Sequence, residues 1–181
     1  MAALLGLAML TVVSACSSPT AGEPKPTGTG SQSSSEPTEQ SSEPNEPDYS
    51  LARLCELISP DEAVELGGAE NGEKGNSASD GHAICTWSDA TTLVVGFQDG
   101  VSSADVKKEG ATNTPTTIDG LTAIQSLKTE PAVICQVMVD LPSGKLFTSA
   151  VGILSAGEGK YDACEVATEL SNLIIPRVKD Q

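Results

Sequence analysis

The chain has 181 residues and a formal net charge of −15, from 25 acidic and 10 basic side chains. This acidity argues against nucleic-acid binding, because contacts to phosphate groups depend on Lys and Arg. It also predicts repulsion from anionic lipid headgroups, so we expect attachment to a membrane to come from a covalent lipid.

Residues 1–15 are almost entirely apolar. The run is shorter than the roughly 20 residues of a membrane-spanning helix, but it has the length of the apolar core of a signal peptide. No Lys or Arg precedes it. A start codon placed too far downstream would explain that absence.

The run ends at Val13-Ser14-Ala15-Cys16, which resembles the cleavage site of bacterial lipoproteins. We therefore predict cleavage before Cys16 and a diacylglycerol on its thiol. The expected location is the extracytoplasmic face of the cell membrane, with the lipid as anchor. The alternatives are an ordinary signal peptide and a buried helix, each with a Cys16 that occurs there by chance.

Residues 16–50 are rich in Ser, Pro and Glu and contain few apolar side chains. Such a composition cannot bury enough apolar surface to offset the entropy of the chain, so a disordered tether is predicted. Whether it is glycosylated is left open. Residues 51–181 are expected to form a single domain.

The first elements of that domain are predicted to be helical. A short helix is expected over 51–58 and another directly after it. Ser59 and Glu62 have the spacing of a capping box at the start of the second helix. The glycines 67–68 are expected to end it, and residues 69–81 to form a loop.

Strand patterns follow the loop. Apolar runs over 83–87 and 92–97, joined by the short polar segment 88–91, predict a hairpin. A short helix is expected over 102–110. A turn at 119–120 then leads into a strand over 121–127.

The strongest strand pattern covers 132–139 and turns back into 146–153, which predicts a central antiparallel hairpin. The last element, 161–175, has apolar residues at helical spacing and is expected to end at Pro176. The fold class predicted is α+β: an antiparallel sheet packed by N-terminal and C-terminal helices.

Four cysteines remain once Cys16 is set aside, and an exported chain meets an oxidising compartment. Three pairings are possible, and we favour Cys55–Cys85 and Cys135–Cys164, each joining a helix to a strand. Cys164 lies on the apolar stripe of its helix, and Cys135 is expected to share a strand face with Val133. Each bond would close about 30 residues and stabilise the fold by roughly 3.5 kcal/mol.

No catalytic, metal or cofactor site is predicted. Structural zinc sites usually contain closely spaced Cys pairs, and none occurs here. A Ser-His-Asp hydrolase needs a His, and the single His82 falls in a loop rich in Ser, Gly and Asn, where a solvated side chain is expected. Trp87 is predicted to be a core ring packed on a disulfide.

Landmarks along the chain resemble those of a known family. They are the opening Cys55-Glu56-Leu57-Ile58-Ser59-Pro60, Cys85-Thr86-Trp87, residues 118–123, Cys135-Gln136-Val137 and Cys164-Glu165-Val166-Ala167. With the lipidation site and the tether, the whole resembles the actinobacterial lipoproteins classified only as a domain of unknown function. The resemblance implies an envelope lipoprotein and supplies neither an activity nor site residues.

The function expected is therefore that of a non-enzymatic module, held at the membrane by its lipid, that binds a small apolar ligand or an envelope protein. One alternative is a cell-envelope hydrolase with an unrecognised site. Another is a structural or secretion-accessory protein. The sequence does not indicate the identity of the ligand or partner, nor the oligomeric state.

Overall fold

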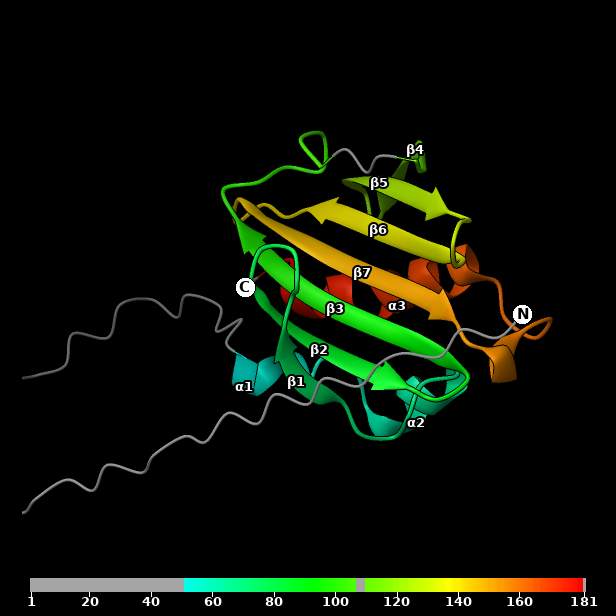
Figure 1. The fold of residues 1–181 in the computed structure, drawn as a ribbon. Coiled ribbons are helices and arrows are strands. Elements are labelled where there is room, and N and C mark those ends of the chain that lie inside the picture. Colours follow the sequence, from blue (N-terminus) through cyan, green and yellow to red (C-terminus); the bar gives the residue numbers. More distant parts are fainter. Residues whose placement is uncertain (1–50, 107–109, 181) are drawn as a thin grey trace, which may run out of the picture. The chain divides into compact units, whose positions relative to one another are not determined.

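In the computed structural model, the described residues are 51–106 and 110–180 (Figure 1). The predicted signal peptide, the lipidation site at Cys16 and the tether lie outside them. Of the first helix, only the side chains of Arg53 and Leu54 are described.

Seven antiparallel strands form one sheet, in the order β1-β2-β3-β7-β6-β5-β4 (Figure 1). The strands are β1 (Glu73–Asn76), β2 (Ala83–Ser88), β3 (Thr91–Asp99), β4 (Thr112–Ile118), β5 (Leu121–Lys128), β6 (Ile134–Asp140) and β7 (Lys145–Ile153). The helices are α1 (Leu51–Leu54), α2 (Pro60–Glu65) and α3 (Ala163–Val178), with a short 3-10 helix, η1 (Ser155–Gly157), before α3. The predicted α+β class with an antiparallel sheet is confirmed.

Strand β7 lies in the middle of the sheet because it pairs with β3 on one side and with β6 on the other. It thereby joins two meanders, β1-β2-β3 and β4-β5-β6-β7. The predicted hairpins β2–β3 and β6–β7 are both present. The turn at 119–120 is also confirmed, since Asp119 and Gly120 both have positive φ angles between β4 and β5.

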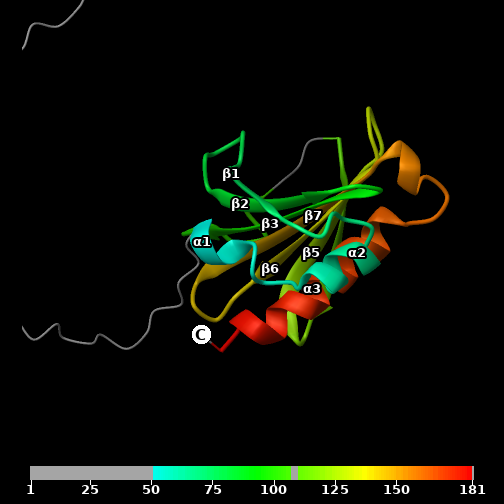
Figure 2. The ribbon, with the colours of Figure 1, turned by 90° about the horizontal axis from the view of Figure 1, so that it is seen from below.

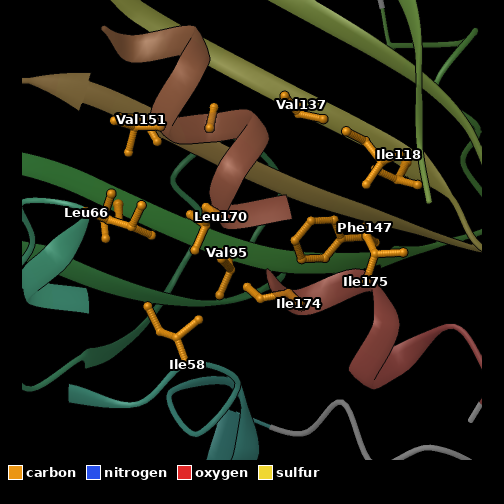
Figure 3. Packing of buried hydrophobic residues seen from close by; sticks show 14 of the residues in the cluster. Ile58, Leu66, Val95, Ile118, Val137, Phe147, Val151, Leu170, Ile174 and Ile175 are labelled. Carbon is orange, nitrogen blue, oxygen red and sulfur yellow. The ribbon is translucent and has the colours of Figure 1, made fainter. Parts of the chain in front are cut away.

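The helices pack on one face of the sheet, which we call the inner face (Figure 2). Helix α3 lies against β6 and β7. Because side chains alternate along a strand, Phe147, Ser149 and Val151 of β7 all point to this face and are fully buried. Phe147 and Val151 pack with Leu170 and Ile174 of α3 in one hydrophobic cluster (Figure 3), and the Ser149 hydroxyl donates to the Ala167 carbonyl of the same helix.

Two helix starts follow the capping rules. The Ser59 side chain accepts from the Glu62 backbone N–H, and the Glu62 carboxylate accepts from the Ser59 N–H, which completes the predicted capping box. At α3, Asp162 accepts from the N–H groups of Cys164 and Glu165.

The predicted end of the last helix at Pro176 is wrong, because α3 continues to Val178. Pro176 lacks an N–H and is unfavourable inside a helix. Burial of Ile175 and Val178 in the core offsets that cost. Arg177 adds bonds to Glu62 and to the Leu57 carbonyl.

Two strands were not predicted. Strand β1 lies inside the expected loop 69–81, and its sequence Glu-Lys-Gly-Asn has no apolar alternation. It pairs with β2 through its backbone, at the edge of the sheet. Strand β4 consists mainly of exposed Thr, Asn and Pro, so hydrophobic periodicity did not reveal it either.

Three boundaries also differ from prediction. Helix α1 ends at Leu54, before the expected residue 58, and the predicted packing of an N-terminal helix is confirmed only in part, by the buried Leu54. The helix expected over 102–110 is absent from its described residues: Ser102 and Asp105 form a turn. Val133 lies outside β6 and is exposed.

The other face of the sheet, the outer face, is covered only in part. Met138 and Leu146 point to this face and are buried outside the main hydrophobic cluster. Near them the β3–β4 connection is held to the sheet, because the backbone N–H and the hydroxyl of Ser103 both donate to the Asp140 carboxylate at 2.7 Å. The rest of the outer face carries the candidate site.

Candidate functional site

A hollow of about 230 Å³ lies on the outer face of the sheet. Its floor comes from alternate residues of neighbouring strands, and its wall is the connection between β1 and β2. The floor is apolar at Ile84, Val94 and Ala150. Polar groups at its border belong to Gln98, Gln136, Thr148 and His82.

Gly96 explains why there is room above β3. It faces Ile84 on β2 and Thr148 on β7, and it has no side chain to fill the space between them. The His82 ring occupies part of that space: a Cβ placed on Gly96 would lie 2.9 Å from His82 Nε2. The glycine thus allows the imidazole to approach the sheet.

His82 is held by Asp80, and Gln98 lies beside both. Its Nδ1 lies 2.5 Å from Asp80 Oδ1 and 3.1 Å from Gln98 Nε2. Gln98 also donates to the second oxygen of Asp80. The side chain of His82 is only 19% exposed, so the prediction of a solvated loop histidine is wrong.

Asp80 is the charged member of this network. Burial raises the pKa of its carboxyl, but hydrogen bonds to Ser77 and His82 outweigh that effect and hold the pKa below its usual value. An ionised Asp80 favours a proton on the adjacent His82 Nδ1 and so orients the ring. The network also fixes the β1–β2 connection against β3.

Within the described residues, the arrangement lacks one contact that a Ser-His-Asp hydrolase requires. A hydrolase of the Ser-His-Asp type needs a hydroxyl bonded to the imidazole. Among the described residues no hydroxyl is hydrogen-bonded to His82, and the Ser77 hydroxyl pairs with Ser79 at 2.9 Å. The apolar floor with amide and hydroxyl groups beside it is typical of a small ligand-binding site.

Sequence analysis missed most of this site. Thr148 and Ala150 lie in a predicted strand, and their alternation with Phe147 and Ser149 was a readable signal for a second face. This alternation does not indicate which of the two faces of the sheet the helices leave uncovered. The proximity of Gln98 to Asp80, which are 18 residues apart, depends on the fold.

The structure contains the two disulfides that the sequence favoured, Cys55–Cys85 and Cys135–Cys164. Their Cα atoms are 5.3 and 5.0 Å apart. Cys55 lies in the turn after α1, so only Cys135–Cys164 joins a helix to a strand in the strict sense. Trp87 is buried in the same core as Cys85, as predicted.

Neither a metal cluster nor a transmembrane helix is present in the described part of the chain. No three His, Cys, Asp or Glu side chains of these residues are grouped closely enough to hold a metal ion. None of the described helices has the length and apolar character needed to cross a bilayer.

Comparison with protein families finds one match: the model described as "Protein of unknown function (DUF3558)" matches residues 11–177. Comparisons with curated proteins and with solved structures find no match. The matched residues include all five cysteines and nearly the whole chain. The resemblance to a family defined only as a domain of unknown function is therefore confirmed, and the chain belongs to the DUF3558 family.

Proposed function

We propose that this protein is a lipoprotein, anchored through Cys16 on the extracytoplasmic side of the membrane, that binds a small, partly apolar ligand in the outer-face hollow. The observation that carries the proposal is the hollow itself, an apolar floor with amide and hydroxyl groups on a sheet face that α2 and α3 leave open.

Unused polar groups support a binding role. Within residues 51–106 and 110–180, the side chains of Gln136 and Thr148 form no hydrogen bond, although both are half-buried at the hollow. Half-buried polar groups gain most from a partner that satisfies them. A volume of about 230 Å³ is below the usual range for drug-sized ligands, about 300–1,000 Å³, so the ligand or the inserted part of it is small.

Three features support the location. The apolar run before Cys16 has the form of a lipoprotein leader, and the tether separates it from the folded part. The two disulfides favour an oxidising compartment outside the cytoplasm. The negative charge disfavours direct adsorption to anionic lipid, so the acyl chains hold the protein at the membrane.

Native mass spectrometry of the full chain purified from its host membrane tests both parts. We expect an acyl mass on Cys16, loss of residues 1–15 and a co-purified small molecule. In the variant Ala150→Phe, the new ring fills the hollow, and the small molecule should be lost. Thr117→Phe, at an exposed position of the same face on β4, is the matched control and should retain it.

Each part can fail separately. An unmodified Cys16 with the leader still attached would overturn the anchoring. A ligand that is absent from the wild-type chain, or that remains bound to Ala150→Phe, would overturn the assignment of the hollow.

A hydrolase is the second candidate, and the Asp80–His82 pair is the observation in its favour. In that case the wild-type protein should convert the bound molecule over time, and His82→Gln should stop the conversion without releasing the ligand. A ligand that stays unchanged in both proteins excludes this reading for that molecule.

A further inference from the structure

The chain enters β6 and leaves β7 at the same end of the sheet (Figure 1). A second hollow, of about 490 Å³, is lined there by residues of the β5–β6 and β7–α3 connections. Its apolar lining includes Pro131, Val133, Ile153 and Tyr161. None of its lining residues belongs to the outer-face hollow. The two sites can therefore be changed independently.

Exposed apolar side chains lie at this end of the sheet, and one of them lines the hollow. Four large apolar side chains are exposed in the described residues, and three of them are Val133, Ile134 and Leu154, at 44%, 41% and 39%. Val133 lines the hollow, and Leu154 directly follows Ile153, another lining residue, whose N–H donates to the Val133 carbonyl. Ile134 pairs with Gly152 and lies on the outer face, outside the hollow. Contiguous exposed apolar groups on a soluble domain mark interaction sites more often than single exposed residues do.

Carboxylates border the apolar side chains. Asp162 lines this hollow and also a neighbouring one between α3 and β5, which includes Glu165 and Glu169. Glu158 lies in the lining of the first. In the described part of the chain, none of these carboxylates forms an ion pair.

The basic groups near this region do not neutralise it. Within the segment 153–172 there are four carboxylates and one cation, Lys160. On the neighbouring strand β5, Lys128 is the backbone partner of Ile134. Glu130 follows Lys128 two residues later in the sequence. An approaching chain therefore meets apolar side chains beside an excess of unpaired negative charge.

We propose that this region, the apolar–acidic surface (Val133, Ile153, Leu154, Glu158, Asp162, Glu165 and Glu169), docks a protein segment in which an apolar side chain is flanked by Lys or Arg. The apolar side chain enters the hollow between Val133 and Tyr161. The basic side chains lie over Glu165 and Glu169 on α3. Apolar burial supplies the affinity, and the carboxylates select a basic partner and accelerate its approach.

Charge complementarity favours this occupant over two others. A second copy would bring the same carboxylates together, because a two-fold interface uses the same patch on both subunits. The same carboxylates would repel the negatively charged headgroups of an anionic lipid surface. A basic protein segment alone complements both the apolar and the charged part.

The test uses a fluorescent peptide of two leucines flanked on each side by two lysines, titrated against the full chain in detergent. Two control peptides replace either the leucines by glycines or the lysines by glutamates. We expect the first peptide to bind and both controls to bind at least about tenfold more weakly. Higher salt should weaken binding of the first peptide.

Matched variants locate the binding. Val133→Ser combined with Leu154→Ser should weaken binding about tenfold, whereas Val64→Ser, at the fourth exposed apolar position on α2, should leave it unchanged. Glu165→Lys with Glu169→Lys should weaken it similarly, and Glu65→Lys with Glu73→Lys should do so far less. All seven positions named here are exposed, so folding should persist and can be checked by circular dichroism.

Three outcomes overturn the proposal. The first is no preference for the leucine–lysine peptide over its controls. The second is equal loss of binding in the control variants, which means attraction to the net charge of the whole domain. The third is self-association of the wild-type chain that Val133→Ser with Leu154→Ser abolishes, because it assigns the surface to a second copy.

Discussion

Phe147 and Thr148 are neighbours in β7, but they face opposite sides of the sheet and different surroundings. Phe147 lies on the inner face, fully buried, with its ring 5.4 Å from that of Phe97. Thr148 lies on the outer face, at the border of a hollow, without a hydrogen-bond partner among the described residues. One face of the same strands thus holds the fold together, and the other is free to carry a binding site.

The sharpest way to break this comparison is to truncate both neighbours. Phe147→Ala should lower the free energy of unfolding by about 3–5 kcal/mol, because it leaves a cavity in the main core. Thr148→Ala should lower it by less than about 1 kcal/mol. Urea unfolding of the two variants measures both values, and comparable losses would show that the outer face is structural as well.

The disulfide on the inner face should come next in size. Replacing Cys135 and Cys164 by Ala opens a link between residues 29 positions apart, which should cost about 3.5 kcal/mol on the chain-entropy model. Because this bond joins α3 to β6, hydrogen exchange should speed up in both elements. A variant with unchanged urea midpoint would remove the disulfide from the features that stabilise the inner face.

A pair of glycines sharpens the description of the outer face. Gly96→Ala should cost about 1–3 kcal/mol, because the new Cβ would lie 2.9 Å from the His82 ring and 3.0 Å from the Ala83 carbonyl. Gly152→Ala is the control: it lies on the same face, and the nearest atom to its new Cβ is 3.9 Å away. Urea unfolding and the NMR signals of His82 report the difference. If both variants behave alike, His82 is not packed on Gly96.

The smallest expected effect concerns pH at the edge of the inner face. Hydrogen bonds from Arg177, and then from Ser59, lower the pKa of Glu62 from 4.5 to about 2. Because the folded-state pKa is below the unfolded value, this ion pair stabilises the fold above pH 4.5 and loses that effect as the pH falls toward 2.

Glu62→Gln should therefore lower the free energy of unfolding by about 0.5–1 kcal/mol at neutral pH, and the deficit should shrink as the pH falls through that window. Glu65→Gln, on the same helix but without an ion pair among the described residues, is the control. Urea unfolding at several pH values measures both. A deficit that is independent of pH would assign the effect to the capping box alone.

The inner face was the more predictable half of the molecule. Apolar alternation over 92–97 and 146–153 identified strands β3 and β7, and the positions of Cys135 and Cys164 indicated a strand and a helix in contact. Strand β1 and strand β4 were missed because both are polar edge strands that pair through their backbones. Hydrophobic patterns contain no information about such pairing.

The candidate site was far less predictable. His82 was expected in solvent because its neighbours in sequence are polar, but Gly96 and Gln98, more than ten residues away, provide its surroundings. The end of α3 shows the same limit. A local rule predicts a stop at Pro176, and burial of Val178 together with the bonds of Arg177 decides otherwise.

The sequence by itself determined which residues seek an apolar interior and where the main strands and the last helix form. It also favoured one pairing of the four cysteines, through the helix and strand patterns around them. These properties are local or follow from composition. Tertiary structure alone decided which face of the sheet the helices cover, and so which side chains line a hollow. That choice depends on contacts between residues far apart in the chain, and such contacts form only when the segments fold together.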